Sequence, residues 1–455
     1  MDGVSFQVGG VPPSQGASED HSGRLRIFFA EILHQEAVME KMMGADYLSA
    51  VLEQKRKRVL LRYSYYEAKE KSPSVEITIP KRLRDMFKAS SGWCAKAVDS
   101  LADRLMVRGI DDDAMNMMQI FNENNPDVLF DSAILGALIA GCNFISIAVG
   151  EDGRPRLEVI DGGNATGVID RTTGLLREGY AVIERDEYGL PVVDAYFEPF
   201  KTTYRYLNEE RIEEIPHPVE HPLLVPIIFK PDARRPFGHS RISRACMYYQ
   251  DRAKRTRERM EVSSEFYSVP QKYVLGLSTE ADDFDTFKAT ISTMLDFRKD
   301  EEDGSVPTVG QFTQQSMEPF IEQMKSDAAD FAGETGLTLD DLGFVSQNPS
   351  SAEAIKASHE TLRLIARKAQ KKFSSGFINT GYLAACLRDG KNYTRAEAVK
   401  SSVMWEPIFE PDMAVLSMIG DGVQKINTAV PGYITADNLR ELTGIKSAKT
   451  VNEEF

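Results

Sequence analysis

The chain has 455 residues, of which 42% are hydrophobic, so it is long enough for more than one domain and apolar enough for a globular interior. It carries 54 Lys and Arg against 69 Asp and Glu, a formal net charge of −15, which argues against tight binding of nucleic acid through a basic surface. The four cysteines are scattered without a C-x-x-C pattern, which argues against a disulfide framework and a zinc site.

The first part of the chain is predicted to contain a flexible arm and then helices. Residues 1–23 are rich in Gly, Ser and Pro, lack the features of a signal peptide, and are predicted to be disordered. Residues 24–70 favour one or two helices, broken near Gly44. A further helix is predicted over 90–110, ended by Gly109, with one apolar face that comprises Trp93, Ala97, Leu101 and Leu105.

Residues 132–150 form an apolar stretch that is nearly long enough to span a bilayer. Gly141, followed by Cys142 and Asn143, divides it into a helix-like half (133–140) and a β-branched half (144–149). We therefore expect a buried helix that turns into a core strand, and no membrane association.

The region 144–228 consists of short β-rich runs separated by turn residues, which predicts an antiparallel sheet. Six prolines then predict that 216–236 is an extended connector rather than a helix or a central strand. His217 and His221 lie in this connector, but the neighbouring prolines and the lack of a third ligand argue against a metal site.

Two helices are predicted to flank a small insert. Residues 240–267 favour a long helix with a seam of modest side chains, and 314–336 favour a second helix with Pro319 in its first turn. Between them, a strand (271–277), an acidic helix (280–304) and a second extended run (305–312) predict a β-α-β insert.

The two flanking helices have opposite charge. Residues 241–267 hold seven Arg and Lys against four Asp and Glu, whereas 314–336 hold one Lys against five Asp and Glu. If the helices pack antiparallel, or against copies in neighbouring subunits, these charges would help to set the register. The alternative is two independent solvated faces, since exposed pairs are worth under ~1 kcal/mol each.

A weakly charged loop (337–349) precedes the longest predicted helix. That helix covers 350–389, and its start is predicted by the capping box that Ser350 forms with Glu353. An apolar stripe along it comprises Ile355, Leu362, Ile365, Ala369, Phe373 and Phe377. The loop contains Gly343 and no Lys or Arg, so we expect a mobile element held between two rigid helices.

Several of these segments carry a family resemblance: GWCAKAVDSLADRLMVRGI (92–110), GALIAGCNFISIAVG (136–150), PFGHSRISRAC (236–246), DLGFVSQNPSSAEAIKASHETL (341–362) and VMWEPIFEPDMAVLSMIGDGVQKI (403–426). From about residue 24 to near the C-terminus, the chain resembles the bacteriophage portal protein (head-to-tail connector) family, in its Gp6-like branch from long-tailed phages.

This resemblance implies an α+β subunit of an elongated, portal type. After the arm (1–23), the implied parts are an α/β wing (24–240), a first stem helix (241–267), a clip (268–313), a second stem helix (314–336), a tunnel loop (337–349), a long wing helix with a returning strand (350–407) and a short helical crown (408–455). It also implies a homo-oligomeric ring, usually of twelve subunits, at one capsid vertex.

The resemblance further implies that double-stranded DNA passes through the ring without sequence recognition. The implied protein partners are the terminase large subunit, a head-completion adaptor, and the major capsid and scaffolding proteins. The location would be the virion, after assembly in the host cytoplasm, and no cofactor is implied.

The resemblance implies two groups of site residues. The tunnel loop would offer van der Waals and hydrogen-bonding contacts to the moving DNA from Leu342, Gly343, Phe344, Val345, Ser346, Gln347 and Asn348. Subunit contacts along the stem would come from Arg252, Arg255, Arg259, Glu318, Glu322 and Lys325. As an alternative, Phe344 and Val345 would dock onto the wing of their own subunit.

Two other function classes stay open at this point. A soluble cytosolic enzyme is one, although the sequence has no P-loop, G-x-S-x-G, H-E-x-x-H or dinucleotide fingerprint, and ELTGIKSAK (441–449) lacks the glycine spacing of a nucleotide loop. Adjacent acids such as Asp282 with Asp283 and Asp340 with Asp341 are weak candidates for Mg²⁺. An adaptor or minor capsid protein of the same particle is the other class. We therefore predict no catalytic residue and no metal.

Overall fold

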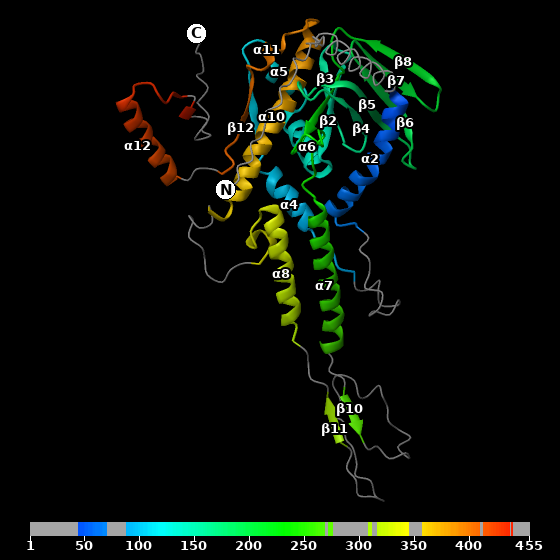
Figure 1. Cartoon of the computed structure of the whole chain (residues 1–455), viewed down its shortest axis with the longest axis vertical. Coiled ribbons are helices and arrows are strands. Elements are labelled where there is room, and N and C mark those ends of the chain that lie inside the picture. The colour runs from blue at the N-terminus through cyan, green and yellow to red at the C-terminus, as the bar shows by residue number, and fades with distance from the viewer. Residues whose placement is uncertain are drawn as a thin grey trace, which may run out of the picture.

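The computed structural model describes residues 44–70, 88–268, 272–275, 308–311, 316–344, 357–409, 413–436 and 438–439. Figure 1 shows an elongated molecule with a mixed body of sheets and helices at one end. Two helices, α7 (Arg244–Ser268) and α8 (Glu318–Thr335), leave this body side by side, and two short strands form the far tip. The fold class is therefore α+β, as predicted.

The first described helices differ in how well the sequence predicts them. Helix α2 (Ala45–Tyr66) begins directly after Gly44, at the predicted break. Helix α4 (Trp93–Ala102) buries the predicted apolar face but stops seven residues before Gly109. The prediction for its second half is wrong, because strand β1 (Val107–Asp111) pairs antiparallel there with β12 (Ser402–Trp405). A partner almost three hundred residues away overrides the local helical preference.

The apolar stretch is a helix followed by a strand, which confirms the prediction. A short helix, α5 (Met117–Asn122), precedes α6 (Pro126–Ala140), which has Pro126 in its first turn. Gly141 takes a left-handed conformation with φ of 98°, ends α6 and leads into β2 (Cys142–Val149). No helix in the described ranges is both long enough and apolar enough to cross a membrane.

Two antiparallel sheets follow. The strands are β3 (Pro155–Ile160), β4 (Ala165–Ile169), β5 (Leu176–Arg185), β6 (Pro191–Glu198), β7 (Lys201–Tyr206), β8 (Arg211–Pro216) and β9 (Leu224–Ile228). One sheet has the order β3-β2-β9 and the other the order β4-β5-β6-β7-β8. Strand β9 lies inside the proline-rich connector and is an edge strand, so Pro226 interrupts no central pairing.

The main core lies around the three-stranded sheet. Helix α6 and the long helix α10 (Glu360–Asp389) both pack against this sheet, and the first six residues of β2 are all buried. Phe373 and Phe377, on the predicted stripe of α10, are fully buried, and Phe377 meets Phe130 of α6 with ring centroids 4.8 Å apart. The helix α11 (Arg395–Ala398) then leads to β12.

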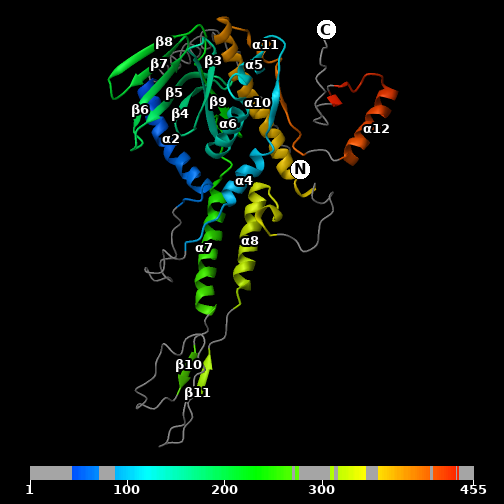
Figure 2. The same cartoon turned by 180° about the vertical axis from the view of Figure 1, so that it is seen from behind.

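The tip and the last helix complete the described chain. Strands β10 (Lys272–Leu275) and β11 (Thr308–Gln311) pair antiparallel, as expected for the two strands of the insert. The helix predicted between them, 280–304, lies outside the described residues. Helix α12 (Met413–Ala429) stands apart from the body in both views (Figures 1 and 2).

Candidate functional site

The helix pair, α7 with α8, is held together by opposite charges within one chain. Arg252 Nη2 lies 2.6 Å from Asp327 Oδ1, and Arg252 Nη1 lies 3.6 Å from Asp330 Oδ2. The Asp327 side chain is fully buried, and this burial raises the pKa of its carboxyl group, while Arg252 acts in the opposite direction. The complementary charges of the two helices therefore meet at this point.

Polar side chains on α7 join the helix pair to the body, and the sequence patterns did not single them out. Gln250 accepts a hydrogen bond of 2.8 Å from the Cys94 amide and donates one of 3.1 Å to the Tyr65 carbonyl. One turn later, Lys254 donates to the Glu70 carbonyl over 3.1 Å. Gln250 and Lys254 are both buried, so they connect α7 firmly to α4 and to the end of α2. In the sequence, the signal for these two residues was their spacing of four residues, at positions outside the predicted seam of modest side chains.

Arg241 makes a second joint, just before α7. Its guanidinium donates to the carbonyl of Ala97 on α4 over 3.3 Å and to the carbonyl of Thr335 at the end of α8. Burial lowers the pKa of Arg241. One cationic side chain thus satisfies carbonyl groups of both the body and the helix pair.

The segment after α8 forms a short 3₁₀ turn, η1 (Asp340–Leu342), that ends at Gly343. Gly343 has φ of 88°, and its amide donates to the Asp340 carbonyl over 3.0 Å. The carboxylate of Asp341 accepts hydrogen bonds of 2.9 Å from both the amide and the hydroxyl of Thr338. His359, immediately before α10, places Nδ1 3.7 Å from Asp341 Oδ2, so η1 lies close to the start of α10.

The comparisons identify the family of the chain. Residues 45–415 match the family model described as "Phage portal protein, SPP1 Gp6-like". The chain belongs to this family. The portal protein of Mycobacterium phage D29 is 23% identical over 441 residues, which cover 91% of this chain and 88% of the relative. The portal protein of Mycobacterium phage L5 is 24% identical over 379 residues, which cover 76% and 73%.

A solved structure titled "Neck of native GTA particle computed with C12 symmetry" covers 86% of this chain and 100% of its own, with 15% identity and a TM-score of 0.43. The match to the family model over residues 45–415 confirms the resemblance seen in the sequence at the level of the portal family.

The predicted tunnel-loop residues of this portal-family chain divide into two groups. Leu342 and Phe344 are half-buried and pack against the main core, which for Phe344 agrees with the docking alternative, while Gly343 is exposed. Val345, Ser346, Gln347 and Asn348 lie outside the described residues, as does the capping box at 350–353. Contact of this loop with DNA stays a prediction.

The predicted stem residues of the portal-family chain lie along the helix pair. Arg252 is engaged within the chain, Arg255 is half-buried, and the other four are exposed: Arg259, Glu318, Glu322 and Lys325. Apart from Arg252, none of them forms an ion pair with another described residue. Their role between subunits stays a prediction.

The residues considered for metal binding do not come together in the described part of the chain. His217 is buried, and burial lowers the pKa values of both His217 and His221. No group of three or more His, Cys, Asp or Glu suited to a metal occurs among the described residues. Asp282, Asp283 and the segment 441–449 lie outside them.

Proposed function

We propose that copies of this chain form a ring, of twelve subunits as the resembled family usually does, at one vertex of a phage capsid. Double-stranded DNA would pass through the ring during packaging and ejection. The family match over residues 45–415 carries this proposal. In this assignment α7 and α8 are the stem, β10 and β11 belong to the clip, and α12 belongs to the crown.

The charge of the chain supports a channel through which DNA passes rather than a surface that binds DNA tightly. The net charge of −15 opposes the retention of a polyanion, and the loop 337–349 contains no Lys or Arg. Loop side chains would then contact DNA by van der Waals and hydrogen-bonding contacts that break easily as the duplex moves. A basic ring would come from other elements, and Lys325 on α8 is a candidate.

The proposed partners follow from this place in the particle. The terminase large subunit would dock during packaging and supply ATP hydrolysis, and a head-completion adaptor would then replace it. The major capsid and scaffolding proteins would surround the ring in the virion, after assembly in the host cytoplasm. The chain itself would act without catalysis and without a cofactor.

The native mass of the purified chain, measured together with negative-stain microscopy, tests the proposal. We expect rings of about a dozen subunits with a central hole, formed by the chain alone or after addition of its scaffolding protein. A monodisperse monomer or dimer under both conditions would contradict the ring and favour the enzyme or adaptor alternatives.

A further inference from the structure

Helix α12 carries an apolar stripe that stays at least partly exposed in the described chain. The stripe consists of side chains at alternating spacings of three and four residues: Leu416, Ile419, Val423, Ile426 and, directly after the helix, Val430. None of these five is buried, and Ile426 and Val430 are 43% and 53% exposed. None belongs to a hydrophobic core cluster or packs against one.

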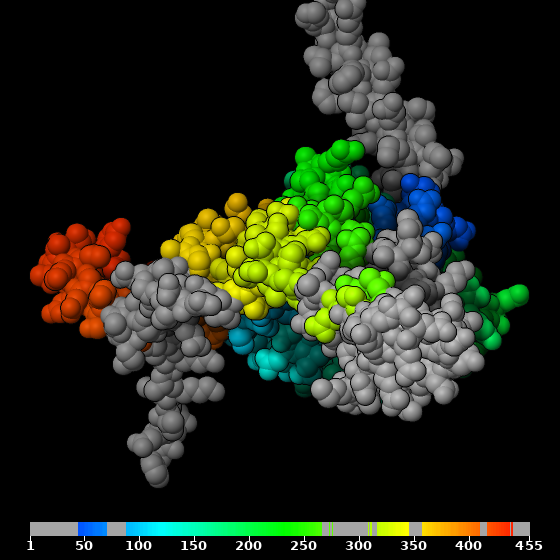
Figure 3. Space-filling model, turned by 90° about the horizontal axis from the view of Figure 1, so that it is seen from below, coloured from blue at the N-terminus to red at the C-terminus, as the bar shows by residue number. Residues whose placement is uncertain are grey.

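Such a helix needs a partner surface. A helix of 17 residues has little stability in water without tertiary packing. Spacings of three and four place the stripe on one side of the helix, which is the arrangement that packs against another surface. Figure 3 shows α12 at one extremity of the molecule, where it projects beyond α10.

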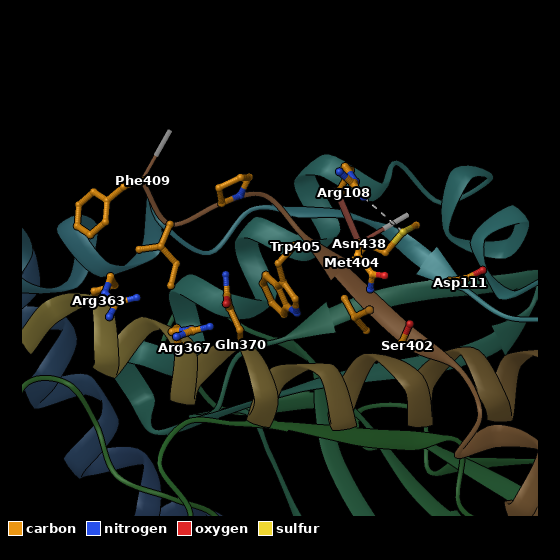
Figure 4. A pocket seen from close by; sticks show the side chains of 13 residues that line it. Arg108, Asp111, Arg363, Arg367, Gln370, Ser402, Met404, Trp405, Phe409 and Asn438 are labelled. Carbon is orange, nitrogen blue, oxygen red and sulfur yellow. Dashed lines mark hydrogen bonds between the residues drawn. The ribbon is translucent and has the colours of Figure 1, made fainter. Parts of the chain in front are cut away.

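A cleft lies on the same chain, between α10 and the segment that begins with β12, and Asn438 from the segment after α12 also lines it. It has a volume of about 900 Å³ and a mixed lining, in which Trp405, Ile408 and Phe409 are apolar and the polar side chains include Arg108, Arg363, Arg367 and Gln370. In Figure 4, Arg363 and Arg367 rise from α10 toward this segment. Arginine stems cover apolar groups while their guanidinium groups stay in water, so this lining suits an amphipathic helix.

The two surfaces lie at the same level of the molecule. In Figures 1 and 2, α12 and β12 are both at the body end, opposite the tip formed by β10 and β11. In a ring whose axis is parallel to the helix pair, rotation from one copy to the next preserves this level. The projecting α12 of one copy therefore lies at the same level as the cleft of the next copy.

We propose that α12 of one copy seats its apolar stripe in the α10–β12 cleft of the adjacent copy. The inference rests on the ring of the proposed function and adds the contact that closes its upper part. A convex helix and a concave cleft are different surfaces, so the contact is heterologous, the type that generates a ring by repetition when the rotation between copies closes. The occupant is thus a second copy of this chain.

Cysteine cross-linking tests the contact directly. The four native cysteines are all buried, so introduced surface thiols are the accessible ones. The double variant Ile426→Cys/Gln370→Cys places one thiol on the stripe and one at the cleft. Under mild oxidation of assembled rings, we expect a ladder of covalent oligomers on a denaturing gel from the double variant and only monomers from each single variant.

The other outcomes overturn the inference in distinguishable ways. An internally linked monomer would mean that α12 covers its own cleft, and dimers from Ile426→Cys alone would mean that two α12 helices pair. Rings that form without any cross-link would contradict the proposed contact but leave the proposed function intact. Absence of rings in the wild-type chain under all conditions would remove both.

Charged substitutions on two faces of α12 provide a second measurement. Ile419→Glu/Ile426→Glu places two charges on the stripe, and Gln424→Glu/Thr428→Glu places the same charge on the polar side of the helix. We expect the stripe variant to lower the ring fraction in native mass spectra at least tenfold, and the control to leave it unchanged. Equal ring fractions in both variants would contradict the inference.

Discussion

Arg252 on α7 and Asp327 on α8 form an ion pair of 2.6 Å in which the carboxylate is completely removed from water. Neither oxygen of this carboxylate makes an aligned hydrogen bond in the described part of the chain. Arg252 is therefore the principal compensation for a buried negative charge, and Asp330 shares the same guanidinium at 3.6 Å. Removal of only one partner of such a pair is strongly destabilising, because the other charge then stays buried without compensation.

Arg252→Met is expected to weaken the helix pair by about 3 kcal/mol at neutral pH, because it leaves Asp327 buried and unpaired. Burial already raises the pKa of Asp327 in the folded state, and loss of Arg252 raises it further. The folded state then favours the protonated carboxyl, so the variant loses stability as pH rises above the ordinary aspartate range and regains it as pH falls.

Hydrogen exchange of α8 peptides at several pH values measures this effect. The double variant Arg252→Met/Asp327→Leu removes both charges and should recover most of the protection. If Arg252→Met loses the same amount of hydrogen-exchange protection at pH 4.5 and pH 7.5, the loss does not come from a buried carboxylate.

Reversal of charge at Arg255 and Arg259 is expected to impair ring formation if charges along the helix pair set the register between subunits. The matched control is Arg177→Glu/Arg211→Glu, which changes the net charge equally on the five-stranded sheet. Native mass spectrometry compares the ring fractions at low and at high salt, since screening should reduce the difference. Normal rings from the Arg255 and Arg259 variant at low salt would exclude the register role.

The sequence predicts those elements whose stability is local, and it fails where a distant segment decides. The helix-to-strand change at Gly141 and the apolar stripe of α10 follow from residue periodicity and one helix-ending glycine. The change from α4 to β1 does not, because β1 exists through its pairing with β12. Likewise, the four-residue spacing of Gln250 and Lys254 does not identify Cys94 and Tyr65 as the partners of Gln250, since both lie more than 150 residues earlier.

The candidate site illustrates the same division. The opposite charges of α7 and α8 were visible in the composition, but which pair is buried depends on the packing of the two helices. Arg252 with Asp327 is the buried pair, whereas Glu318 and Glu322 remain exposed. Asp327 was part of the charge count but was not singled out, because only tertiary packing distinguishes it from its exposed neighbours.

Gly343→Pro is expected to leave rings intact and reduce the amount of packaged DNA. The φ of 88° at Gly343 is closed to proline, and the substitution also removes the amide that bonds the Asp340 carbonyl. Gly343→Asn is the matched control, because asparagine tolerates this conformation and, apart from the chain neighbours, no atom of the described residues lies within 4 Å of an added Cβ. Deletion of 343–347 should act in the same direction as proline.

Packaged DNA in nuclease-treated particles provides the readout for these loop variants. Full packaging by both Gly343→Pro and the deletion would count against a role of the loop in DNA passage. Reduced ring formation by either variant would instead indicate a structural role.

Phe331 on α8 is expected to anchor the helix pair to the body through Trp93 on α4, because their ring centroids are 5.5 Å apart and both side chains are buried. Phe331→Ala leaves a cavity at this joint and should cost about 3 to 5 kcal/mol. Phe320→Ala is the control on the same helix, since its side chain is only half-buried.

The chain has two tryptophans, so in a Trp405→Phe background the fluorescence of Trp93 reports on this joint alone. We expect the red shift of Trp93 emission on unfolding to occur at a much lower urea concentration in Phe331→Ala. In Phe320→Ala it should occur at nearly the same urea concentration as in the parent chain. Equal shifts would mean that the joint is held by the polar contacts of Gln250 rather than by the aromatic pair.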